Sequence, residues 1–152
     1  MAGKTRNKYD YPVDISGGIE MSYDKSPAHV GNLKNSVDFI CKEGTKVRAA
    51  GDGVVVDIKS DSDIGGSGRE FELFGNFIEI KHGNDECSEY EHLKKNGLLV
   101  KIGDQVKRGQ IIGYSGATGW LAHLGPHLHF MVGKYGKDND DYETLEIVWN
   151  TK

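Results

Sequence analysis

The sequence predicts an all-β chain built as a single domain of antiparallel sheets. Its 152 residues include 21 glycines but only 3 prolines, a composition typical of short strands joined by tight turns. Asp52-Gly53 stands between two apolar runs, which is a strong local signal for a β-hairpin. The sequence holds no long apolar stretch with a period of 3.6 residues, so we expect little helix.

Apolar runs with alternating polarity mark the predicted strands. We expect strands over residues 45–50, 54–59, 69–74, 77–82, 89–93 and 143–149, with a further extended segment starting at Val37. Residues 60–68 and 113–125 are rich in glycine and polar residues and predict loops. Residues 1–20 predict a loosely held N-terminal arm, and residues 21–152 form the domain.

A short phrase occurs twice in the chain. Residues 44–51 and 100–110 each place a glycine, a valine two or three positions later and a basic residue ahead of a tight turn. This repeat predicts two related β-hammerhead, barrel-sandwich-like halves. A similar phrase occurs in biotinyl and lipoyl carrier domains, which need an exposed lysine at a hairpin tip, typically beside methionine. The methionines here are Met1, Met21 and Met131, away from both hairpins, which disfavours a carrier.

Composition excludes several classes of protein. The net charge of −4 argues against a nucleic-acid binder, because a phosphate footprint needs a basic face. No apolar run is long enough to span a membrane, and residues 1–12 lack the apolar middle of a secretory signal. Cys41 and Cys87 fit no Cys-x-x-Cys pattern and are either two unpaired thiols or, outside the cytosol, a disulfide.

His127 and His129 are the centre of the predicted chemistry. In an extended strand their side chains face the same side, about 7 Å apart, while Leu128 and Phe130 face the other. A lone His-x-His pair is weak evidence for a metal. The pair gains weight from the other histidines and carboxylates of the chain.

Three further side chains complete a candidate site: His29, Asp38 and His92. A catalytic zinc ion takes three protein ligands plus water, and neutral imidazole and carboxylate are suitable ligands. Two histidines and one aspartate supply that set and leave two histidines to move protons near neutral pH. We therefore expect an open groove that carries a metal site.

The sequence also predicts where the side chains of several other residues lie. It places Tyr90 and His92 on one face of their strand and Glu89, Glu91 and Leu93 on the other. His82 ends a strand just before Gly83-Asn84-Asp85, and we expect it at the surface. Trp120 either forms a wall of the groove or packs on the edge of the barrel.

Taken in order, several phrases resemble the lysostaphin-type zinc endopeptidases, also called the LytM-like domain family, which cut peptide bonds in bacterial peptidoglycan. The resemblance runs from His29 to Val132. Its phrases are His29…Val37-Asp38-Phe39, residues 44–55, residues 75–83, Tyr90-Glu91-His92-Leu93, residues 106–113, and residues 115–119 leading to Gly125-Pro126-His127-Leu128-His129-Phe130. The series as a whole is highly specific.

The resemblance implies a role for each position. His29, Asp38 and His129 match the family's zinc ligands, for one Zn²⁺ per chain, and His92 and His127 match its two catalytic histidines. Many members place the first two ligands four residues apart, as His-x-Gly-x-Asp, whereas nine separate them here, which resembles a looser branch. His123 is the nearest substitute for His29, and Tyr23 is a weak match for a tyrosine that helps bind the transition state in relatives.

The function that follows is a zinc-dependent endopeptidase acting on the stem or cross-bridge peptides of peptidoglycan. The alternative is a non-catalytic domain of this family that binds cell-wall peptides or activates a partner hydrolase. We expect a monomer with no nucleic-acid partner and no membrane span. Its substrate lies outside the cytoplasm, so we expect a secreted or cell-envelope protein, although no signal peptide is visible.

Overall fold

The computed structural model describes residues 3–23, 33–121, 124–136 and 141–150. Strands dominate these residues, with three short 3₁₀ helices among them. The strands are β1 (Lys4–Tyr9), β2 (Glu20–Ser22), β3 (Val37–Ile40), β4 (Lys46–Arg48), β5 (Gly53–Lys59), β6 (Gly65–Gly66), β7 (Asn76–Lys81), β8 (Cys87–Leu93), β9 (Gln105–Val106), β10 (Ile111–Tyr114), β11 (Gly119–Trp120), β12 (Leu128–Lys134), β13 (Glu143–Thr144) and β14 (Glu146–Trp149). The helices are η1 (Ile15–Gly17), η3 (Arg69–Phe74) and η4 (Gly83–Asp85).

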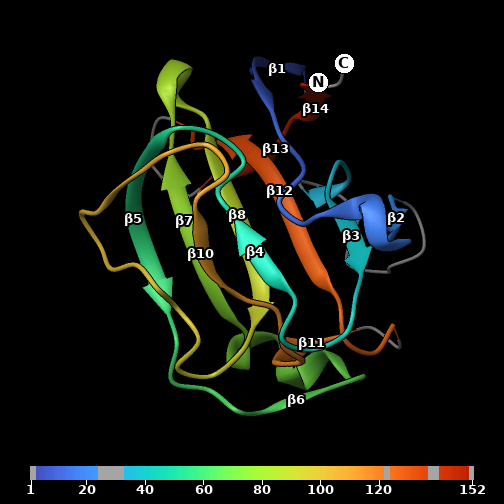
Figure 1. Cartoon of the computed structure of the whole chain (residues 1–152). Coiled ribbons are helices and arrows are strands. Elements are labelled where there is room, and N and C mark those ends of the chain that lie inside the picture. Colours follow the sequence, from blue (N-terminus) through green and yellow to red (C-terminus); the bar gives the residue numbers. More distant parts are fainter. Residues whose placement is uncertain (1–2, 24–32, 122–123, 137–140, 151–152) are drawn as a thin grey trace.

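One antiparallel sheet of eight strands organises the fold. Its strand order is β2-β3-β12-β8-β7-β5-β9, and β13 pairs with β12. The long strand β12 therefore lies between β3 and β8 (Figure 1). The prediction of an all-β, antiparallel architecture is confirmed, with the exception of two small parallel pairs, β1 with β14 and β6 with β11.

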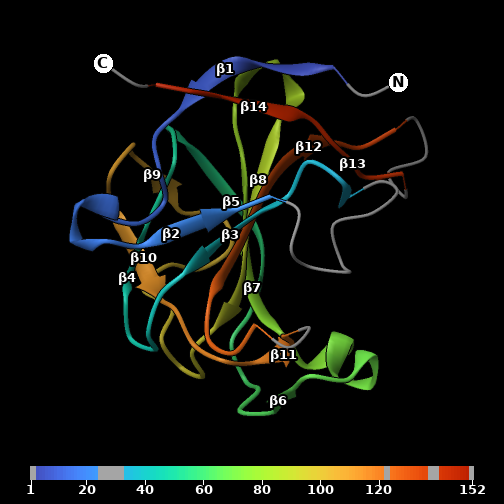
Figure 2. The same ribbon diagram turned by 90° about the vertical axis from the view of Figure 1, so that its right-hand side faces the viewer.

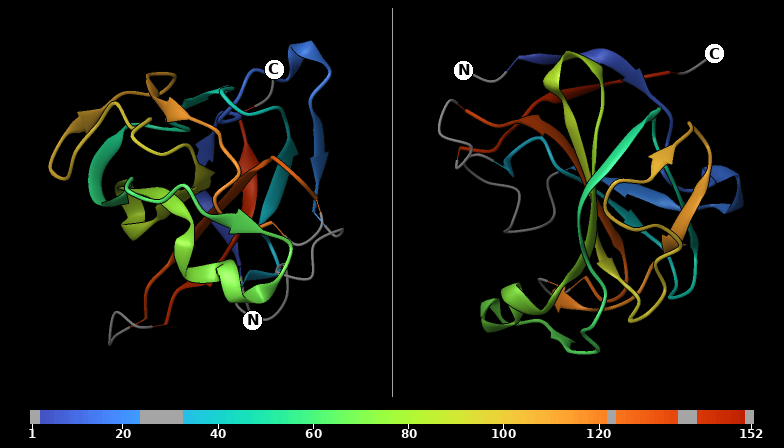
Figure 3. Two further views of the ribbon diagram at one scale, coloured as in Figure 1. Left: turned by 90° about the horizontal axis from the view of Figure 1, so that it is seen from below. Right: turned by 90° about the vertical axis from the view of Figure 1, so that its left-hand side faces the viewer.

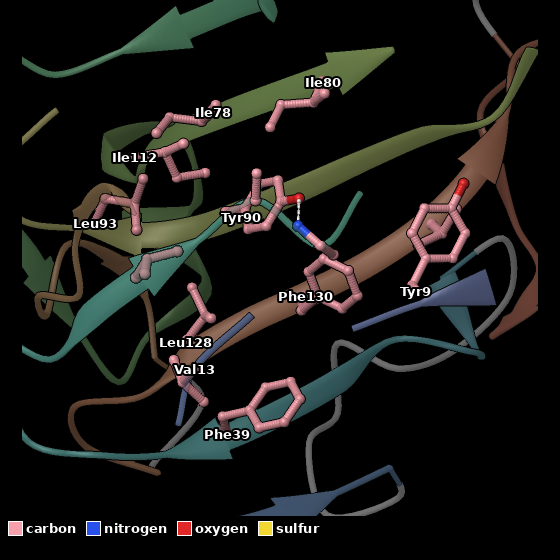
Figure 4. Packing of buried hydrophobic residues seen from close by; sticks show 14 of the residues in the cluster. Tyr9, Val13, Phe39, Ile78, Ile80, Tyr90, Leu93, Ile112, Leu128 and Phe130 are labelled. Carbon is pink, nitrogen blue, oxygen red and sulfur yellow. Dashed lines mark hydrogen bonds between the residues drawn. The ribbon is translucent and has the colours of Figure 1, made fainter. Parts of the chain in front are cut away.

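The hydrophobic core lies against one face of this sheet. Alternate residues of the central strands are fully buried there, among them Phe39, Tyr90 and Phe130. Figure 4 shows these rings packed with aliphatic side chains from neighbouring strands, and its dashed line marks the hydrogen bond that the Ala50 amide donates to the Tyr90 hydroxyl at 2.9 Å. Because side chains alternate along a strand, the residues between them face away from the core. That opposite face carries the candidate site.

The two similar phrases of the sequence lie side by side. β4 pairs with β10, and β5 pairs with β9. Backbone hydrogen bonds join them directly: the Ala49 amide donates to the Gln110 carbonyl at 2.8 Å, and the Gly109 amide donates to the Ala49 carbonyl at 2.9 Å. Their interpretation as related halves stays a prediction, but the two phrases form one packed unit.

The prediction of a loosely held N-terminal arm is wrong for residues 4–9. They form β1, which runs parallel to β14 across the end of the sheet where both termini lie (Figure 2). Tyr9 is 1% exposed and Val13 is 2% exposed, so the arm contributes apolar surface to the core. The division of the chain at residue 20 into arm and domain stays a prediction.

Residues 69–74 form the helix η3 instead of the predicted strand. Gly68 precedes the helix, and Glu70 and Glu72 lie in its first turn, where acidic side chains interact favourably with the helix dipole. Apolar residues that alternate with charged ones over only six positions do not distinguish a strand from a short helix. Figure 2 shows η3 at the end of the molecule opposite β1 and β14, and the left view of Figure 3 shows that end from below.

His82 is buried, contrary to the prediction of a surface position. It is 7% exposed. The rings of Tyr9 and His82 meet edge to face, with their centroids 5.1 Å apart. Its Nδ1 hydrogen-bonds the Asp52 carbonyl and its Nε2 the Ser88 hydroxyl, both at 2.7 Å. The N-terminal strand covers a histidine that local sequence places at a strand end.

None of the helices in the described ranges has the length and apolar character to cross a membrane.

Candidate metal and catalytic site

The register of three central strands sets Asp38 and His129 side by side. Asp38 on β3 pairs with His129 on β12, and His129 pairs in turn with Glu91 on β8. All three face away from the core, because their strand neighbours, such as Phe130, face into it. Two segments 91 residues apart in sequence thereby bring a carboxylate and an imidazole together.

Asp38 lies between the two histidines of the His-x-His pair. Its Oδ1 is 3.1 Å from Nδ1 of His129 and 3.6 Å from Nε2 of His127. The exposed fractions are 0% for Asp38, 2% for His127 and 4% for His129. Burial alone would lower the pKa of His129, but its hydrogen bond with Asp38 and the nearby Glu91 carboxylate raise that pKa. The prediction that Asp38, His127 and His129 come together therefore matches the geometry.

His92 joins this group through a β-bulge. The register between β7 and β8 shifts at Asn76 and Phe77, and His92 is the extra residue on β8, with a left-handed φ of 68°. The bulge turns His92 away from the face of Tyr90, where simple alternation places it. The centroid of the His92 ring lies 4.6 Å from that of His127 and 5.9 Å from that of His129.

Backbone carbonyls fix the orientation of both His92 and His127. Nδ1 of His92 lies 2.7 Å from the Thr118 carbonyl, and Nδ1 of His127 lies 2.8 Å from the Gly125 carbonyl. A carbonyl oxygen only accepts, so each Nδ1 carries the proton and each Nε2 is the basic nitrogen. Burial, followed by the neighbouring His127 and His129, lowers the pKa of His92 to about 3. His92 is therefore uncharged at neutral pH.

Thr118 supports the bulge from the loop before β11. Its hydroxyl donates to the Leu93 carbonyl at 2.7 Å and accepts from the Asn76 amide at 3.0 Å. The Asn76 side chain also donates to the Leu93 carbonyl, at 3.2 Å. These bonds satisfy the backbone groups that the bulge removes from the ladder. Thr118 lies in the predicted loop 113–125, and its contact with His92 depends on the tertiary fold.

A groove of about 450 Å³ opens beside these histidines. It lies over the non-core face of the sheet and is walled by η3 and β11, with Trp120 among its lining residues. Of the two predictions for Trp120, the structure supports the groove wall. Glu89 and Glu91 line the same groove. Burial raises the pKa of both carboxyls, and repulsion from neighbouring acidic groups raises it further, while the nearby His129 opposes the rise at Glu91.

Other candidate residues lie elsewhere or outside the described residues. His29 and the substitute His123 fall in residues 24–32 and 122–123, which the structure does not describe. Tyr23 is exposed, accepts a hydrogen bond from Trp149 at 2.9 Å and is not among the described residues that line the groove. Cys41 and Cys87 are buried free thiols, as the first of the two alternatives expects.

Comparison with known proteins identifies the family. Residues 32–141 match the sequence profile of peptidase family M23. The chain belongs to this family. Its membership confirms the resemblance to the lysostaphin-type endopeptidases.

Individual M23 relatives differ in the bond that their names state. The chain is 40% identical over 124 residues to the peptidoglycan DD-endopeptidase ShyA of Vibrio cholerae, covering 79% of this chain and 26% of that protein. It is 39% identical over 120 residues to the glycyl-glycine endopeptidase ALE-1 of Staphylococcus capitis, again covering 79% and 26%. The chain thus spans about a quarter of the length of these curated relatives.

A solved M23 structure supports the same fold. The crystal structure of a zinc-containing peptidase from Vibrio cholerae superposes with a TM-score of 0.58 at 33% sequence identity, covering 83% of this chain and 36% of that one.

Proposed function

We propose that this chain is a zinc-dependent endopeptidase that hydrolyses peptide bonds in the stem or cross-bridge of bacterial peptidoglycan. The observation that carries the proposal is the buried group of Asp38, His92, His127 and His129 at the groove. The M23 family and the names of its relatives support the reaction class.

The donor atoms of Asp38 and His129 fit a zinc ion. In a tetrahedral site with ligand bonds of 2.0–2.2 Å, two donor atoms lie about 3.3 Å apart. Oδ1 of Asp38 and Nδ1 of His129 lie 3.1 Å apart. No group of three His, Cys, Asp or Glu side chains within the described ranges is arranged to hold a metal ion. We propose His29 as the third ligand, as the family resemblance implies.

A bound zinc ion would supply a Lewis acid that lets water attack a peptide carbonyl near neutral pH. The chain's own contribution is to move protons and to bind developing charge. Nε2 of His92 or of His127 takes the proton of the attacking water, since both rings are held with Nε2 as the basic nitrogen. The other histidine donates a hydrogen bond to the oxygen that becomes negative at the scissile carbonyl only as an imidazolium, with Nε2 protonated as well as Nδ1.

The chain's site of action follows from its substrate. Peptidoglycan lies outside the cytoplasm, so we propose that the domain works in the cell envelope or after secretion. We propose that it acts as a monomer.

Digestion of bacterial sacculi tests the proposal directly. Purified protein is incubated with sacculi of two cross-link types, one with direct stem links and one with glycine bridges, and released peptides are read by mass spectrometry. We expect new peptide ends in at least one type, and none with His92→Ala. Bound zinc is measured in the same preparation. Intact sacculi with one zinc per chain would instead support the alternative, a domain that binds cell-wall peptides without cutting them.

A further inference from the structure

A buried asparagine lies opposite the bulge that carries His92. Asn76 on β7 pairs with Leu93 on β8, at the point where the ladder between these strands shifts register. Asn76 is fully buried, and Nδ2 of its side chain donates to the Ser62 and Leu93 carbonyls at 2.8 and 3.2 Å. Its Oδ1 accepts from the Ser62 amide at 3.1 Å. The Asn76 side chain therefore joins the loop before η3 to the backbone directly after His92.

His92 needs support from its surroundings because its backbone is strained. Its φ of 68° lies in the left-handed region, which residues with a side chain rarely adopt and which persists only where surrounding contacts fix it. The His92 carbonyl accepts from the Gly116 amide at 2.8 Å. The Leu93 carbonyl accepts from the Asn76 side chain and from the Thr118 hydroxyl, at 3.2 and 2.7 Å. Three donors thus hold the conformation that turns His92 toward the site.

Asn76 and Thr118 act on the backbone and on the ring of His92 as one connected set. The Asn76 amide donates to the Thr118 hydroxyl at 3.0 Å, and the Thr118 carbonyl accepts from Nδ1 of His92 at 2.7 Å. The Asn76 carboxamide supplies two donors and one acceptor in one plane, and an ionised aspartate has the same shape but no donor. The three bonds of this side chain therefore depend on the amide group itself.

We propose that Asn76 is a positioning residue for His92, and that with Thr118 it holds the left-handed backbone that keeps the His92 ring beside that of His127. The inference rests on the proposed function, to which it adds a residue that is not among the described residues lining the groove. Without these donors the bulge relaxes toward regular alternation, which turns the His92 ring away from the site. A displacement of about 1 Å is enough to cost roughly 100-fold in rate.

Two substitutions that preserve shape remove the donors. Asn76→Asp replaces the Nδ2 group with an oxygen, and Thr118→Val replaces the hydroxyl with a methyl group. In the zinc-loaded full chain, acting on a wall peptide that the wild type cuts, we expect kcat to fall about 10- to 100-fold and KM to change less than about twofold. Bound zinc should stay at the wild-type level. Thr118→Ser keeps the hydroxyl and should retain most of the wild-type kcat.

A spectroscopic signal reports the position of the His92 ring without catalysis. In protein with ¹⁵N-labelled histidine, the Nδ1 hydrogen of His92 should give a slowly exchanging signal, assigned by its loss in His92→Ala. We expect this signal to shift or broaden in Asn76→Asp and Thr118→Val and to stay in place in Thr118→Ser. The internal reference is His82, whose Nδ1 also lies on a backbone carbonyl, that of Asp52.

The matched control for stability is Tyr9→Phe. It removes a buried hydrogen bond, from the Tyr9 hydroxyl to Glu86 at 2.8 Å, and neither residue is among those described as lining the groove. We expect this variant to lose stability while its kcat and its His92 signal stay at the wild-type values. A loss that follows stability alone would appear here as well.

The outcomes distinguish the positioning role from a structural one. An unchanged His92 signal in both Asn76→Asp and Thr118→Val would overturn the role, whatever the kcat. Equal changes in Thr118→Ser and Thr118→Val, or a change in Tyr9→Phe as large as that in Asn76→Asp, would overturn it too. If Asn76→Asp does not fold, the two Thr118 variants decide by the same criteria. A shifted signal in variants of a wild type that cuts no wall peptide would keep the positioning role and refute the endopeptidase.

Discussion

His92 and His127 meet edge to face, with ring centroids 4.6 Å apart and ring planes at 65°. Each ring donates its Nδ1 hydrogen to a backbone carbonyl, that of Thr118 or that of Gly125. The pairing leaves two basic Nε2 atoms in the same buried group as Asp38 and His129. Backbone carbonyls therefore hold His92 and His127, while Oδ1 of Asp38 lies 3.1 Å from Nδ1 of His129 and 3.6 Å from Nε2 of His127.

Substitution of His129 and of His92 should have different effects on zinc. We expect His129→Ala to lose bound zinc and activity together, because it removes one of three proposed ligands. His92→Ala should keep zinc and lose roughly 100- to 10,000-fold in rate. Metal content by mass spectrometry and hydrolysis of a wall peptide measure the two effects. Wild-type turnover of His92→Ala would refute the role assigned to His92.

Gly119 is a position where one methyl group should disturb His92. Gly119 has a left-handed φ of +86°, and a Cβ there would lie 2.7 Å from Cα of Gly75 and 3.3 Å from Nδ1 of His92. We expect Gly119→Ala to lower the free energy of unfolding by about 2–4 kcal/mol through strain and overpacking, and to reduce the rate.

The matched control is Gly103→Ala. Gly103 has a similar φ of +95° but open space around its Cα, so only the conformational cost of about 1–2 kcal/mol applies. Urea unfolding and hydrolysis rates compare the two variants. Equal losses of stability in the two variants, with no loss of rate in either, would show that crowding against Gly75 and His92 affects neither stability nor catalysis.

His82 should make stability depend on pH. Burial is the largest cause that lowers the pKa of His82 below its ordinary value of 6.5. Below pH 6.5 this histidine binds a proton in the unfolded chain more readily than in the folded chain. The stabilisation of the folded state that is present above pH 6.5 is therefore lost as the pH falls. The loss is at most about 1.4 kcal/mol per pH unit for one proton.

Urea unfolding of the wild type and of His82→Gln at several pH values from 7.5 to 5 measures this contribution. The difference in unfolding free energy between the two proteins should shrink toward acid pH. Parallel pH curves would show that His82 titrates alike in the folded and unfolded chains.

Glu86 should hold the N-terminal strand in place. This fully buried carboxylate accepts hydrogen bonds from the amides of Arg6 and Asn7, at 2.6 and 3.3 Å, and from the Tyr9 hydroxyl at 2.8 Å. We expect Glu86→Ala to cost about 2–4 kcal/mol, because several buried donors lose their acceptor, and Tyr9→Phe to cost about 1 kcal/mol. Hydrogen exchange of the Arg6 and Asn7 amides reports the effect locally. Unchanged protection in Glu86→Ala would contradict this role.

Much of the fold follows from local pattern. The hairpin glycines, the apolar runs and the low proline content predict the strands that become β4, β5, β7 and β8. Local pattern fails at η3, where six residues fit both a strand and a short helix. It also fails at the N-terminal strand, because β1 pairs with β14 at the far end of the chain. The alternation of polar and apolar residues within one segment does not show which distant segment it pairs with.

The sequence by itself determined the residue types of the site and the common face of His127 and His129, because a period of two is a property of any extended strand. The tertiary structure decided the rest. Strand register set Asp38 beside His129, and the bulge at His92 moved that side chain from the face of Tyr90 to the face of the site. Register and bulges depend on pairing between strands, and the pairing energy comes from partners that no local stretch of sequence contains.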